Sequence, residues 1–317
     1  MVNTPAVCLI VNPAAGGGKA ARVAPQALTM LREHGLTVRR VDTRDLAHAR
    51  ELALAAASAG ETVAVLSGDG AIGAVADALR DVPGAILGVL PGGRGNDLAR
   101  VLGVARLDLA CATIAHGVSR AMDLGEVVGT DGAHAFVGIA SVGFDSDANR
   151  IANEAPPWLG NLVYAYGALR ALLSWRPARF ELELDPPGER HGFTAYTIGA
   201  ANSKSYGGGM RAAPSAMLDD GLLEVVVLER VGKLAFLTKI LPRVFSGEHV
   251  REPCVHVFRA REVAIEADRA FVMFADGDPI GELPLRVRAA RGAIRVLVPA
   301  EDPAYCAFSP AVAAAPR

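Results

Sequence analysis

Apolar and polar positions in the first third of the chain alternate between short continuous apolar runs and stretches of helical period. We expect strands at residues 6–11, 37–41, 62–66 and 85–90. Helical patterns lie between and after them, at residues 19–34, 45–59, 71–80 and 96–102. Apolar strands joined by crossover helices are typical of a parallel sheet that is covered on both faces. Residues 1–120 are therefore predicted to form a doubly wound α/β domain.

After about residue 120 the pattern changes to closely spaced strands with Gly, Pro and Asp turns. We expect strands at residues 121–128, 135–142, 179–184, 194–200, 222–228, 255–259, 263–266, 271–274, 284–289 and 294–298. This spacing predicts an antiparallel β-sandwich, interrupted by helices at 158–175 and 233–245. The second domain is predicted to span residues 121–300, and an Ala- and Pro-rich tail follows at 301–317.

The predicted helix at 158–175 has two interpretations. Its apolar residues recur at helical spacing, which favours an amphipathic helix that faces the core. Contact with acyl chains or with a membrane interface is the alternative, because Trp158 and Trp175 stand at its ends and arginines lie close by.

Composition narrows the class of protein. The net charge is only −2, with both signs interspersed, which argues against nucleic acid as a partner. The four cysteines are scattered without a CxxC pair, so neither a disulfide framework nor a zinc site is expected. No apolar stretch reaches the ~18 uninterrupted residues of a spanning helix, and Asn12-Pro13 interrupts the first apolar run. We expect a cytoplasmic protein with no transmembrane segment.

Three glycine-rich loops follow three of the predicted parallel strands, at residues 11–19, 67–71 and 91–97. Bare backbone N–H groups and helix N-termini favour phosphate, and the carboxyl ends of parallel strands lie at one edge of a sheet. The first loop is not a P-loop, since Pro13 and Ala20 occupy two of its defining positions. The second matches GxGxxG, but Asp69 would lie beside the pyrophosphate of a dinucleotide. Ordinary turn glycines remain the alternative for any one loop alone.

A turn near the far end of the chain carries paired carboxylates, Asp276 and Asp278, around Gly277 and before Pro279. A carboxylate on a rigid turn is suited to accept a proton. Together with three phosphate-binding loops, this turn points to phosphoryl transfer.

These segments resemble the signature blocks of the diacylglycerol kinase-like lipid kinases. The blocks are Asn12-Pro13 with Gly16 and Lys19, then residues 67–70, 91–100 and 276–279. They occur in the family's order and cover nearly the whole chain, and the Gly-Asn-Asp-Leu-Ala-Arg block at 95–100 is the most specific. The family includes soluble bacterial diacylglycerol kinases, and it is related to sphingosine kinases and, more distantly, to NAD kinases.

The resemblance implies an ATP-binding N-terminal domain, a β-sandwich C-terminal domain and an active site in the cleft between them. The nucleotide contacts that it implies are Asn12, Pro13, Ala14, Ala15, Gly16, Lys19, Thr43, Ser67, Gly68, Asp69, Gly70, Ala71, Ile72, Gly73, Gly93, Arg94, Asn96 and Asp97. It places the proton acceptor at Asp276 or Asp278, and a structural Mg²⁺ at Asp220 with main-chain carbonyls of Met217 and Leu222. The charges of Lys19, Arg100 and Asp123 would link the metal site to the nucleotide domain.

Three positions depart from the family's pattern. Ala71 stands where the family has Thr, which removes a hydroxyl near the phosphates. Arg94 replaces a small or hydroxyl residue and adds a bidentate phosphate donor that partly compensates. Asp278 replaces Glu and shortens the reach of the acceptor by one methylene. The family's position favours Asp278 as the base, and the shorter side chain makes Asp276 the competing candidate.

The resulting hypothesis is ATP- and Mg²⁺-dependent phosphorylation of a lipid hydroxyl, with diacylglycerol as the expected acceptor. One alternative is an NAD kinase-like enzyme acting on a soluble hydroxyl, against which the block at 95–100 speaks. The other is a non-catalytic regulator that binds nucleotide or lipid. Ala71 and Asp278 favour it weakly. Five retained polar residues speak against it: Asp69, Asn96, Asp97, Asp220 and Asp276. The expected partner is lipid at the inner membrane surface, met transiently through an apolar rim that the sequence does not locate; a homodimer is left open.

Overall fold

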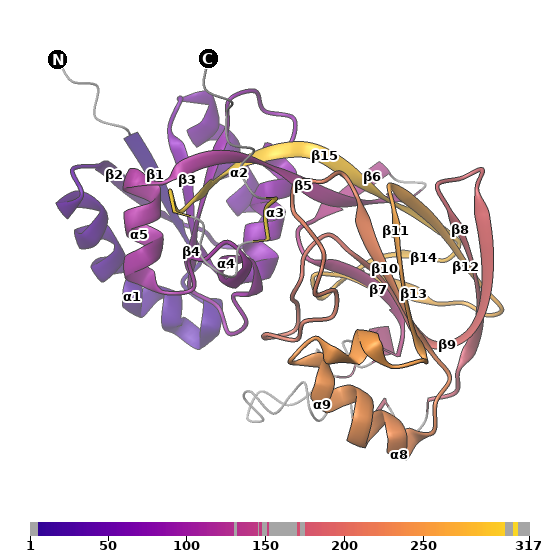
Figure 1. Cartoon of the computed structure of the whole chain (residues 1–317). Helices are drawn as coiled ribbons and strands as arrows, with labels where there is room; N and C mark the ends of the chain where they lie inside the picture. The colour runs from indigo at the N-terminus through magenta and orange to yellow at the C-terminus, as the bar shows by residue number, and fades with distance from the viewer. Residues whose placement is uncertain are drawn as a thin grey trace, which may run out of the picture.

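The computed structural model describes residues 6–129, 132–144, 146, 147, 151, 170, 171, 175–301 and 307–309. Its two parts lie side by side, an α/β part formed by the first third of the chain and a β-rich part formed by the remainder (Figure 1). The predicted helix at 158–175 lies almost entirely outside the described residues.

The first part is built on a parallel sheet in the order β4-β3-β1-β2. Its strands are β1 (Ala6–Val11), β2 (Thr37–Asp42), β3 (Thr62–Ser67) and β4 (Ile86–Pro91). The helices are α1 (Ala15–Glu33), α2 (Leu46–Ser58), α3 (Asp69–Leu79), α4 (Asp97–Val101) and α5 (Leu107–His116). β1, β3 and β4 are buried along nearly their whole length, as strands covered on both faces must be.

The pattern of apolar residues did not predict helix α5. α5 packs against β4 at Gly88, where an added Cβ would lie 2.9 Å from Cγ1 of Ile114. The glycine in the middle of a strand therefore makes room for a helix that the local pattern only weakly indicates.

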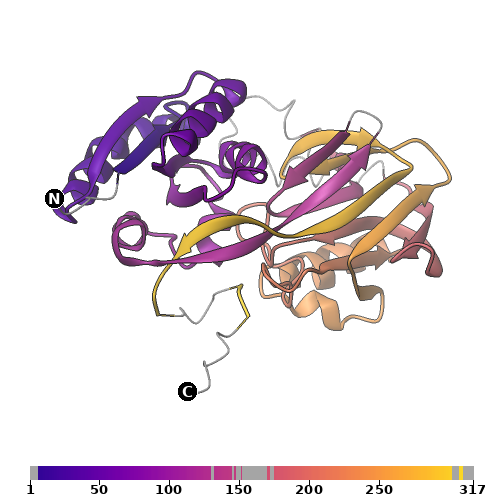
Figure 2. The ribbon, with the colours of Figure 1, turned by 90° about the horizontal axis from the view of Figure 1, so that it is seen from above.

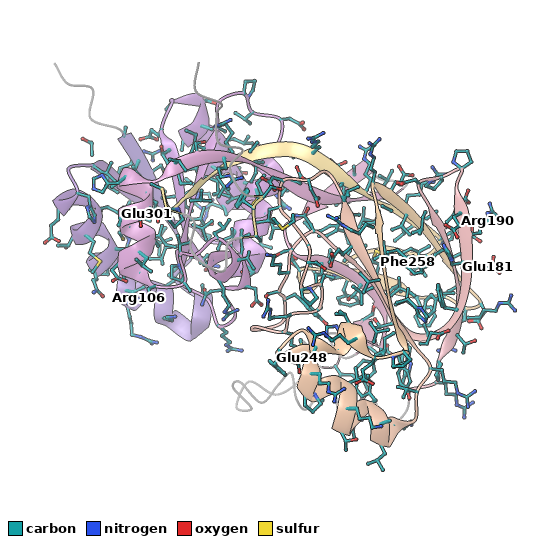
Figure 3. All side chains as sticks on the ribbon, in the orientation of Figure 1. Arg106, Glu181, Arg190, Glu248, Phe258 and Glu301 are labelled. Atoms are coloured by element: carbon teal, nitrogen blue, oxygen red, sulfur yellow. The ribbon has the colours of Figure 1, made fainter. Side chains whose placement is uncertain are left out.

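The second part is an antiparallel β-sandwich, which confirms the predicted fold class. Its strands are β5 (Val118–Gly129), β6 (Gly132–Phe136), β7 (Ile139–Gly143), β8 (Ala178–Leu184), β9 (Glu189–Ala201), β10 (Leu223–Glu229), β11 (Val255–Ala260), β12 (Glu262–Ala267), β13 (Val272–Ala275), β14 (Asp278–Glu282) and β15 (Leu285–Val298). Along β8 the side chains alternate, with Phe180 and Leu182 in the core and Glu181 on the outer surface (Figure 3). Glu181 and Arg190 are both labelled on the β8–β9 hairpin in that view.

β15 connects the two parts. It pairs antiparallel with β5 over most of its length, and its last residues pair parallel with β4. In Figure 2 this strand runs from the sandwich to the α/β part alongside β5. Residue 120, where the predicted first domain ends, falls inside β5. The division into domains at that residue therefore stays a prediction.

Two predicted elements differ in a way that matters for the site. The strand expected at 135–142 is broken into β6 and β7 at Val137 and Gly138, whose N–H groups turn toward a side chain instead of a neighbouring strand. The helix expected at 233–245 is a succession of α8 (Lys233–Ala235), the π-helix η2 (Phe236–Ile240) and α9 (Leu241–Val244), followed by the 3₁₀ turn η3 (Glu248–Arg251). Among the described residues, no helix combines the length and the apolar character that a membrane crossing requires.

Candidate active site

A cavity of about 960 Å³ lies where the carboxyl ends of the first sheet face the sandwich. The three glycine-rich loops and Asp276 form its polar half. Side chains of the sandwich and of the segment 236–245 form an apolar half: Phe144, Val226, Leu228, Phe236, Leu237, Ile240, Leu241, Val244, Phe245 and Val255. The cavity is therefore continuous from a phosphate-binding surface to an apolar one.

The glycine loops are packed directly against one another. An added Cβ at Gly93 would lie 2.4 Å from the Cα of Gly68, and one at Gly16 would lie 2.6 Å from the carbonyl oxygen of Gly92. Gly16 also has a φ of +61°, in the left-handed region that favours glycine. These glycines are required because three backbone segments meet there, and the contact sets the shape of the polar half.

Asp69 organises this surface through hydrogen bonds to the third loop. Its carboxylate accepts hydrogen bonds from the N–H groups of Asp97 and Leu98, both at 3.1 Å. The third loop is held in turn by Asn96, whose Oδ1 accepts from the Gly93 N–H at 2.7 Å and whose Nδ2 donates to the Gly93 carbonyl at 2.9 Å. Two backbone N–H groups thus stabilise the negative charge of Asp69, which reduces the repulsion that this carboxylate would exert on a pyrophosphate.

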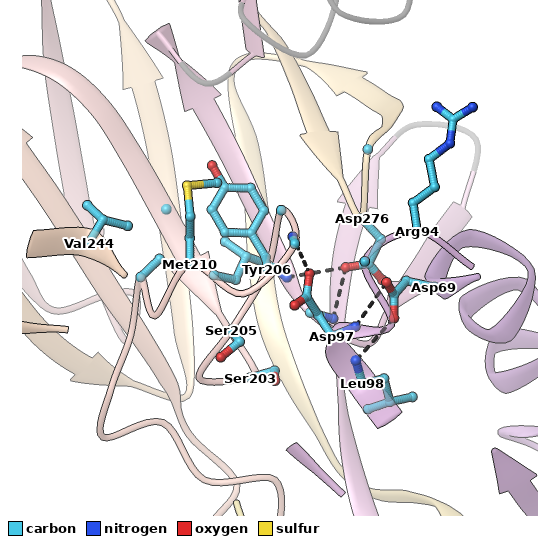
Figure 4. Close-up of a pocket in the computed structure, with 18 of the residues that line it drawn as sticks. Asp69, Arg94, Asp97, Leu98, Ser203, Ser205, Tyr206, Met210, Val244 and Asp276 are labelled. Carbon is cyan, nitrogen blue, oxygen red and sulfur yellow. Dashed lines mark hydrogen bonds between the residues drawn. The ribbon is translucent and has the colours of Figure 1, made fainter. Parts of the chain in front are cut away.

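Asp97 connects the loops to the second part of the molecule. Its Oδ2 accepts a hydrogen bond from the Gly208 N–H at 2.7 Å, and its Oδ1 pairs with Arg100. Burial raises the pKa of Asp97, while the hydrogen bond from Gly208 lowers it. Gly208 lies in a glycine triplet, 207–209, whose φ angles are all positive. Figure 4 shows Asp97 between Asp69 and the loop that carries Tyr206.

Asp276 is held at the wall of the cavity by three backbone amides. Its Oδ2 accepts from the Val137 N–H at 2.8 Å, and its Oδ1 accepts from Gly138 at 2.9 Å and Ile139 at 3.3 Å. Burial raises the pKa of Asp276 to about 7, and the charge of Asp69 adds to the rise, whereas the three amides oppose it. Asp69, Asp97 and Asp276 lie close together around one space in Figure 4. A carboxyl group with a pKa near neutrality, in a cavity beside phosphate-binding loops, is suited to general-base chemistry.

Asp278 occupies a different place. It is exposed on β14 and lines a separate cavity of about 180 Å³ with Arg50 and His134. Gly70 and Asp276 line both cavities, whereas Asp278 lines only the smaller one. The geometry therefore favours Asp276 as the base, whereas the family's position favours Asp278.

Most of the nucleotide contacts implied by the resemblance line the large cavity: Asn12, Ala14, Ala15, Gly16, Ser67, Gly68, Asp69, Gly70, Ala71, Gly93, Arg94 and Asp97. Pro13, Lys19, Thr43, Ile72, Gly73 and Asn96 do not line it. Ile72 is fully buried in the core, and Oγ1 of Thr43 donates to the carbonyl of Asp45. Arg94 is exposed, and its guanidinium is directed away from Asp69 and Asp97 (Figure 4). The assignment of these residues to a nucleotide stays a prediction.

The predicted magnesium site lies outside the cavity. Asp220 accepts a hydrogen bond from the Leu222 N–H at 3.0 Å and pairs with the half-exposed Arg259. Beside it, the buried Asp123 accepts from the N–H groups of Gly221 and Gly292, both at 2.6 Å, and burial raises the pKa of Asp123. Within the described ranges, no three His, Cys, Asp or Glu side chains converge as metal ligands.

The residues of this turn nevertheless fit the expected ion. A site of one carboxylate with main-chain carbonyls offers the oxygen ligands that Mg²⁺ prefers, and Arg259 would have to release the carboxylate. Mg²⁺ at Asp220, Met217 and Leu222 remains a prediction, and a metal there would act on the structure of the turn because none of these residues lines the cavity.

Sequence reasoning missed two parts of the site. One is the loop that carries Ser203, Ser205 and Tyr206, for which the glycine triplet at 207–209 was the available signal. The hydroxyls of both serines are buried and have no hydrogen-bond partner among the described residues. The other is the apolar half of the cavity, where the buried His249 also lies; its Nε2 donates to the carbonyl of Ala212 at 3.1 Å, and burial lowers its pKa. No pattern distinguishes apolar residues that line a cavity from those that fill a core.

Comparison with known proteins places both parts of the chain. A family model described as the diacylglycerol kinase catalytic domain matches residues 6–127, and one described as the YegS C-terminal NAD kinase beta sandwich-like domain matches residues 138–298. The chain is 33% identical over 300 residues to a protein of Mycobacterium tuberculosis named diacylglycerol kinase, covering 92% of this chain and 95% of the relative. It is 32% identical over 265 residues to a probable lipid kinase YegS-like of Pseudomonas fluorescens, covering 82% and 85%.

The fold is similar to a crystal structure of a diacylglycerol kinase from Bacillus anthracis, with a TM-score of 0.72 and 21% identity, covering 96% of this chain and all of that one. The two family matches follow one another in the order in which the α/β part and the sandwich occur here. On these matches, the chain belongs to the diacylglycerol kinase-like family of lipid kinases.

Proposed function

We propose that this kinase transfers the γ-phosphate of ATP to the hydroxyl of diacylglycerol, giving phosphatidic acid and ADP. Family membership makes the chain a lipid kinase that uses ATP. The observation that carries the finer proposal is the continuity of one cavity from the glycine loops and Asp276 to a wall of apolar side chains. Diacylglycerol has a polar end with a hydroxyl and an apolar end with acyl chains, which matches the polar and apolar halves of the cavity.

The apolar half also bears on the NAD kinase-like alternative. Residues such as Phe236, Leu228 and Ile240 are buried and line the cavity. A soluble, charged acceptor would leave these side chains in contact with water or with polar groups. An acyl chain would instead cover them and remove their apolar surface from water, which is favourable. The lining therefore favours a lipid acceptor over a dinucleotide.

In the proposed reaction Asp276 accepts the proton of the lipid hydroxyl as its oxygen attacks the γ-phosphorus. The new O–P bond forms as the bond from the γ-phosphorus to the bridging oxygen breaks, and ADP leaves with the electron pair. An ionised carboxylate has about four acceptor sites, and three of those on Asp276 are taken by amides, so about one is left for the hydroxyl. The amides of the glycine loops hold the phosphates, and the exposed Arg94 would add a donor by turning toward them. Mg²⁺ bound with ATP would supply charge neutralisation.

The pH dependence follows from Asp276. Because the base must be ionised, kcat/KM is expected to fall about tenfold per pH unit below about 7 and to level off above it. Initial rates from pH 5 to 9 with a constant-ionic-strength buffer measure this. An activity that is flat across pH 5.5–7 would contradict the assignment of the base.

The same group affects stability with a defined sign. The folded pKa of Asp276 lies above its unfolded value, so its contribution to the free energy of unfolding is fully present below about pH 4 and is lost as pH rises through about 7. The melting temperature of an Asp276→Asn variant is therefore expected to vary less between pH 5 and 8 than that of the wild type. An equal pH dependence in both proteins would contradict the raised pKa.

Filling the apolar half should discriminate against long acyl chains. Val226 lies on β10, lines the cavity and is half-buried, so Val226→Phe places a ring where acyl carbons would lie. We expect kcat/KM to fall about tenfold for a long-chain diacylglycerol and by much less for a short-chain one. Val257→Phe on the neighbouring strand β11 is the matched control, because Val257 pairs with Val226 but does not line the cavity. Equal losses on both chain lengths would remove the acyl chain from this half of the cavity.

A further inference from the structure

The helical segment 233–245 carries apolar side chains on two sides. Phe236 and Ile240 are buried against the sandwich and line the cavity. Leu234 is 75% exposed, Phe245 56% and Leu237 37%. The central turn of this segment is the π-helix η2, a form that is rare and occurs frequently at functional sites. Large apolar side chains gathered on one exposed segment mark an interaction surface more often than isolated ones do.

Two of these exposed residues locate the opening of the cavity. Leu237 and Phe245 line the cavity and also reach solvent. The apolar half of the cavity therefore opens at this segment, and the exposed surface is continuous with the inner apolar wall. We call Leu234, Leu237, Lys239 and Phe245 the lip of the cavity.

The charge of the same stretch has one sign. Residues 230–247 contain four Lys or Arg residues and no Asp or Glu. Lys239 is exposed on η2, between the apolar residues of the lip, whereas Arg243 pairs with Glu252. Glu229 and Glu248 flank the stretch, and Glu248 is labelled in Figure 3. Apolar residues beside basic ones are the combination that binds an anionic lipid surface.

We propose that the lip docks on the surface of a bilayer that contains anionic lipids, so that the acceptor lipid passes from the bilayer into the cavity without exposing its acyl chains to water. The lip inserts its leucine and phenylalanine side chains among the acyl chains, and Lys239 contacts the headgroups. This inference rests on the proposed lipid acceptor, but docking itself can be measured without turnover.

The test is co-sedimentation of the whole protein with vesicles of phosphatidylcholine that contain phosphatidylglycerol. Leu234→Asp and Lys239→Glu alter the lip at positions that do not line the cavity. Each is expected to weaken vesicle binding about tenfold or more, and added salt should weaken the wild type in the same assay. Leu109→Asp on α5 and Arg190→Glu on the β8–β9 hairpin are matched controls. Leu109 is 46% exposed, and its helix α5 lies away from α8 in Figure 1. Arg190 is labelled away from the helical segment in Figure 3.

The outcomes separate docking from the proposed reaction. If both lip variants lose vesicle binding but phosphorylate a water-soluble short-chain diacylglycerol at the wild-type rate, docking is supported independently of catalysis. If they bind vesicles as the wild type does, the lip is not the docking surface, whatever lipid is phosphorylated. Sedimentation of the protein without vesicles tests whether a second copy of the chain binds the lip instead. A dimer that Leu234→Asp dissociates, with no change in vesicle binding, would overturn the proposal. If the wild type binds vesicles but phosphorylates no lipid, only the proposed function is contradicted.

Discussion

Replacing Asp276 with Asn is expected to lower kcat by about 10²–10⁴-fold while the affinity for ATP stays nearly unchanged. The side chain keeps its shape but can no longer accept the proton of the attacking hydroxyl. One of its oxygens becomes an NH₂ group, so either the Val137 N–H or both the Gly138 and Ile139 N–H groups lose their acceptor. The same change removes a charge whose burial is unfavourable, so the two effects on the free energy of unfolding oppose each other. Turnover with saturating lipid and the ATP-induced shift in melting temperature measure the two quantities.

Asp278 supplies the matched comparison. Asp278→Asn is expected to lower kcat by less than about tenfold, because this carboxylate faces the smaller cavity. Asp278→Glu, which lengthens the side chain by one methylene, tests whether the longer reach brings the carboxylate into the reaction. A large loss for Asp278→Asn with a small loss for Asp276→Asn would reverse the two roles, and full turnover in both Asn variants would exclude the carboxylate-base mechanism.

The second large effect is expected from Gly70→Val. Gly70 lies in the first turn of α3, lines both cavities, and has only Oδ2 of Asp278 within 4.0 Å of an added Cβ. The fold therefore has room for valine, and valine costs a helix less than glycine does. Its methyl groups would nevertheless occupy the space in which phosphate meets the loop amides. We expect the ATP- and Mg²⁺-induced rise in melting temperature to disappear. In the wild type, ATP at a hundred times its Kd should increase the free energy of unfolding by about 2.7 kcal/mol.

Gly192→Val is the control for this substitution. Gly192 lies in β9, has no atom within 4 Å of an added Cβ and does not line the cavity. That variant should keep the full ATP-induced shift. If Gly70→Val also keeps it, the loop at 67–71 does not bind the phosphates.

The α/β part of the fold could be predicted because its signals are local. β1, β3 and β4 are continuous apolar runs, and a glycine loop follows each of them. The position of each loop is therefore known once the end of its strand is known. Parallel pairing then brings the loops together without further information. The break between β6 and β7 could not be predicted in this way, because it depends on Asp276, a residue 139 positions away from Val137.

The candidate site shows the same limit. The turn at 276–279 was recognisable, but the choice between Asp276 and Asp278 depends on which one faces the cavity, a three-dimensional property. Asp69 looked unfavourable for phosphate until its two amide partners were known. The apolar half of the cavity could not be predicted from the sequence, since residues such as Val226 and Leu228 have the pattern of an ordinary buried strand.

The central claim is that the cavity presents a lipid hydroxyl to Asp276 and ATP. The most direct measurement is transfer of label from γ-labelled ATP in mixed micelles, with diacylglycerol, monoacylglycerol, sphingosine and NAD offered separately, followed by identification of the product. The account predicts labelled phosphatidic acid from diacylglycerol, dependence on Mg²⁺, and its loss in Asp276→Asn. Labelling of NAD with none of the lipids phosphorylated would contradict it.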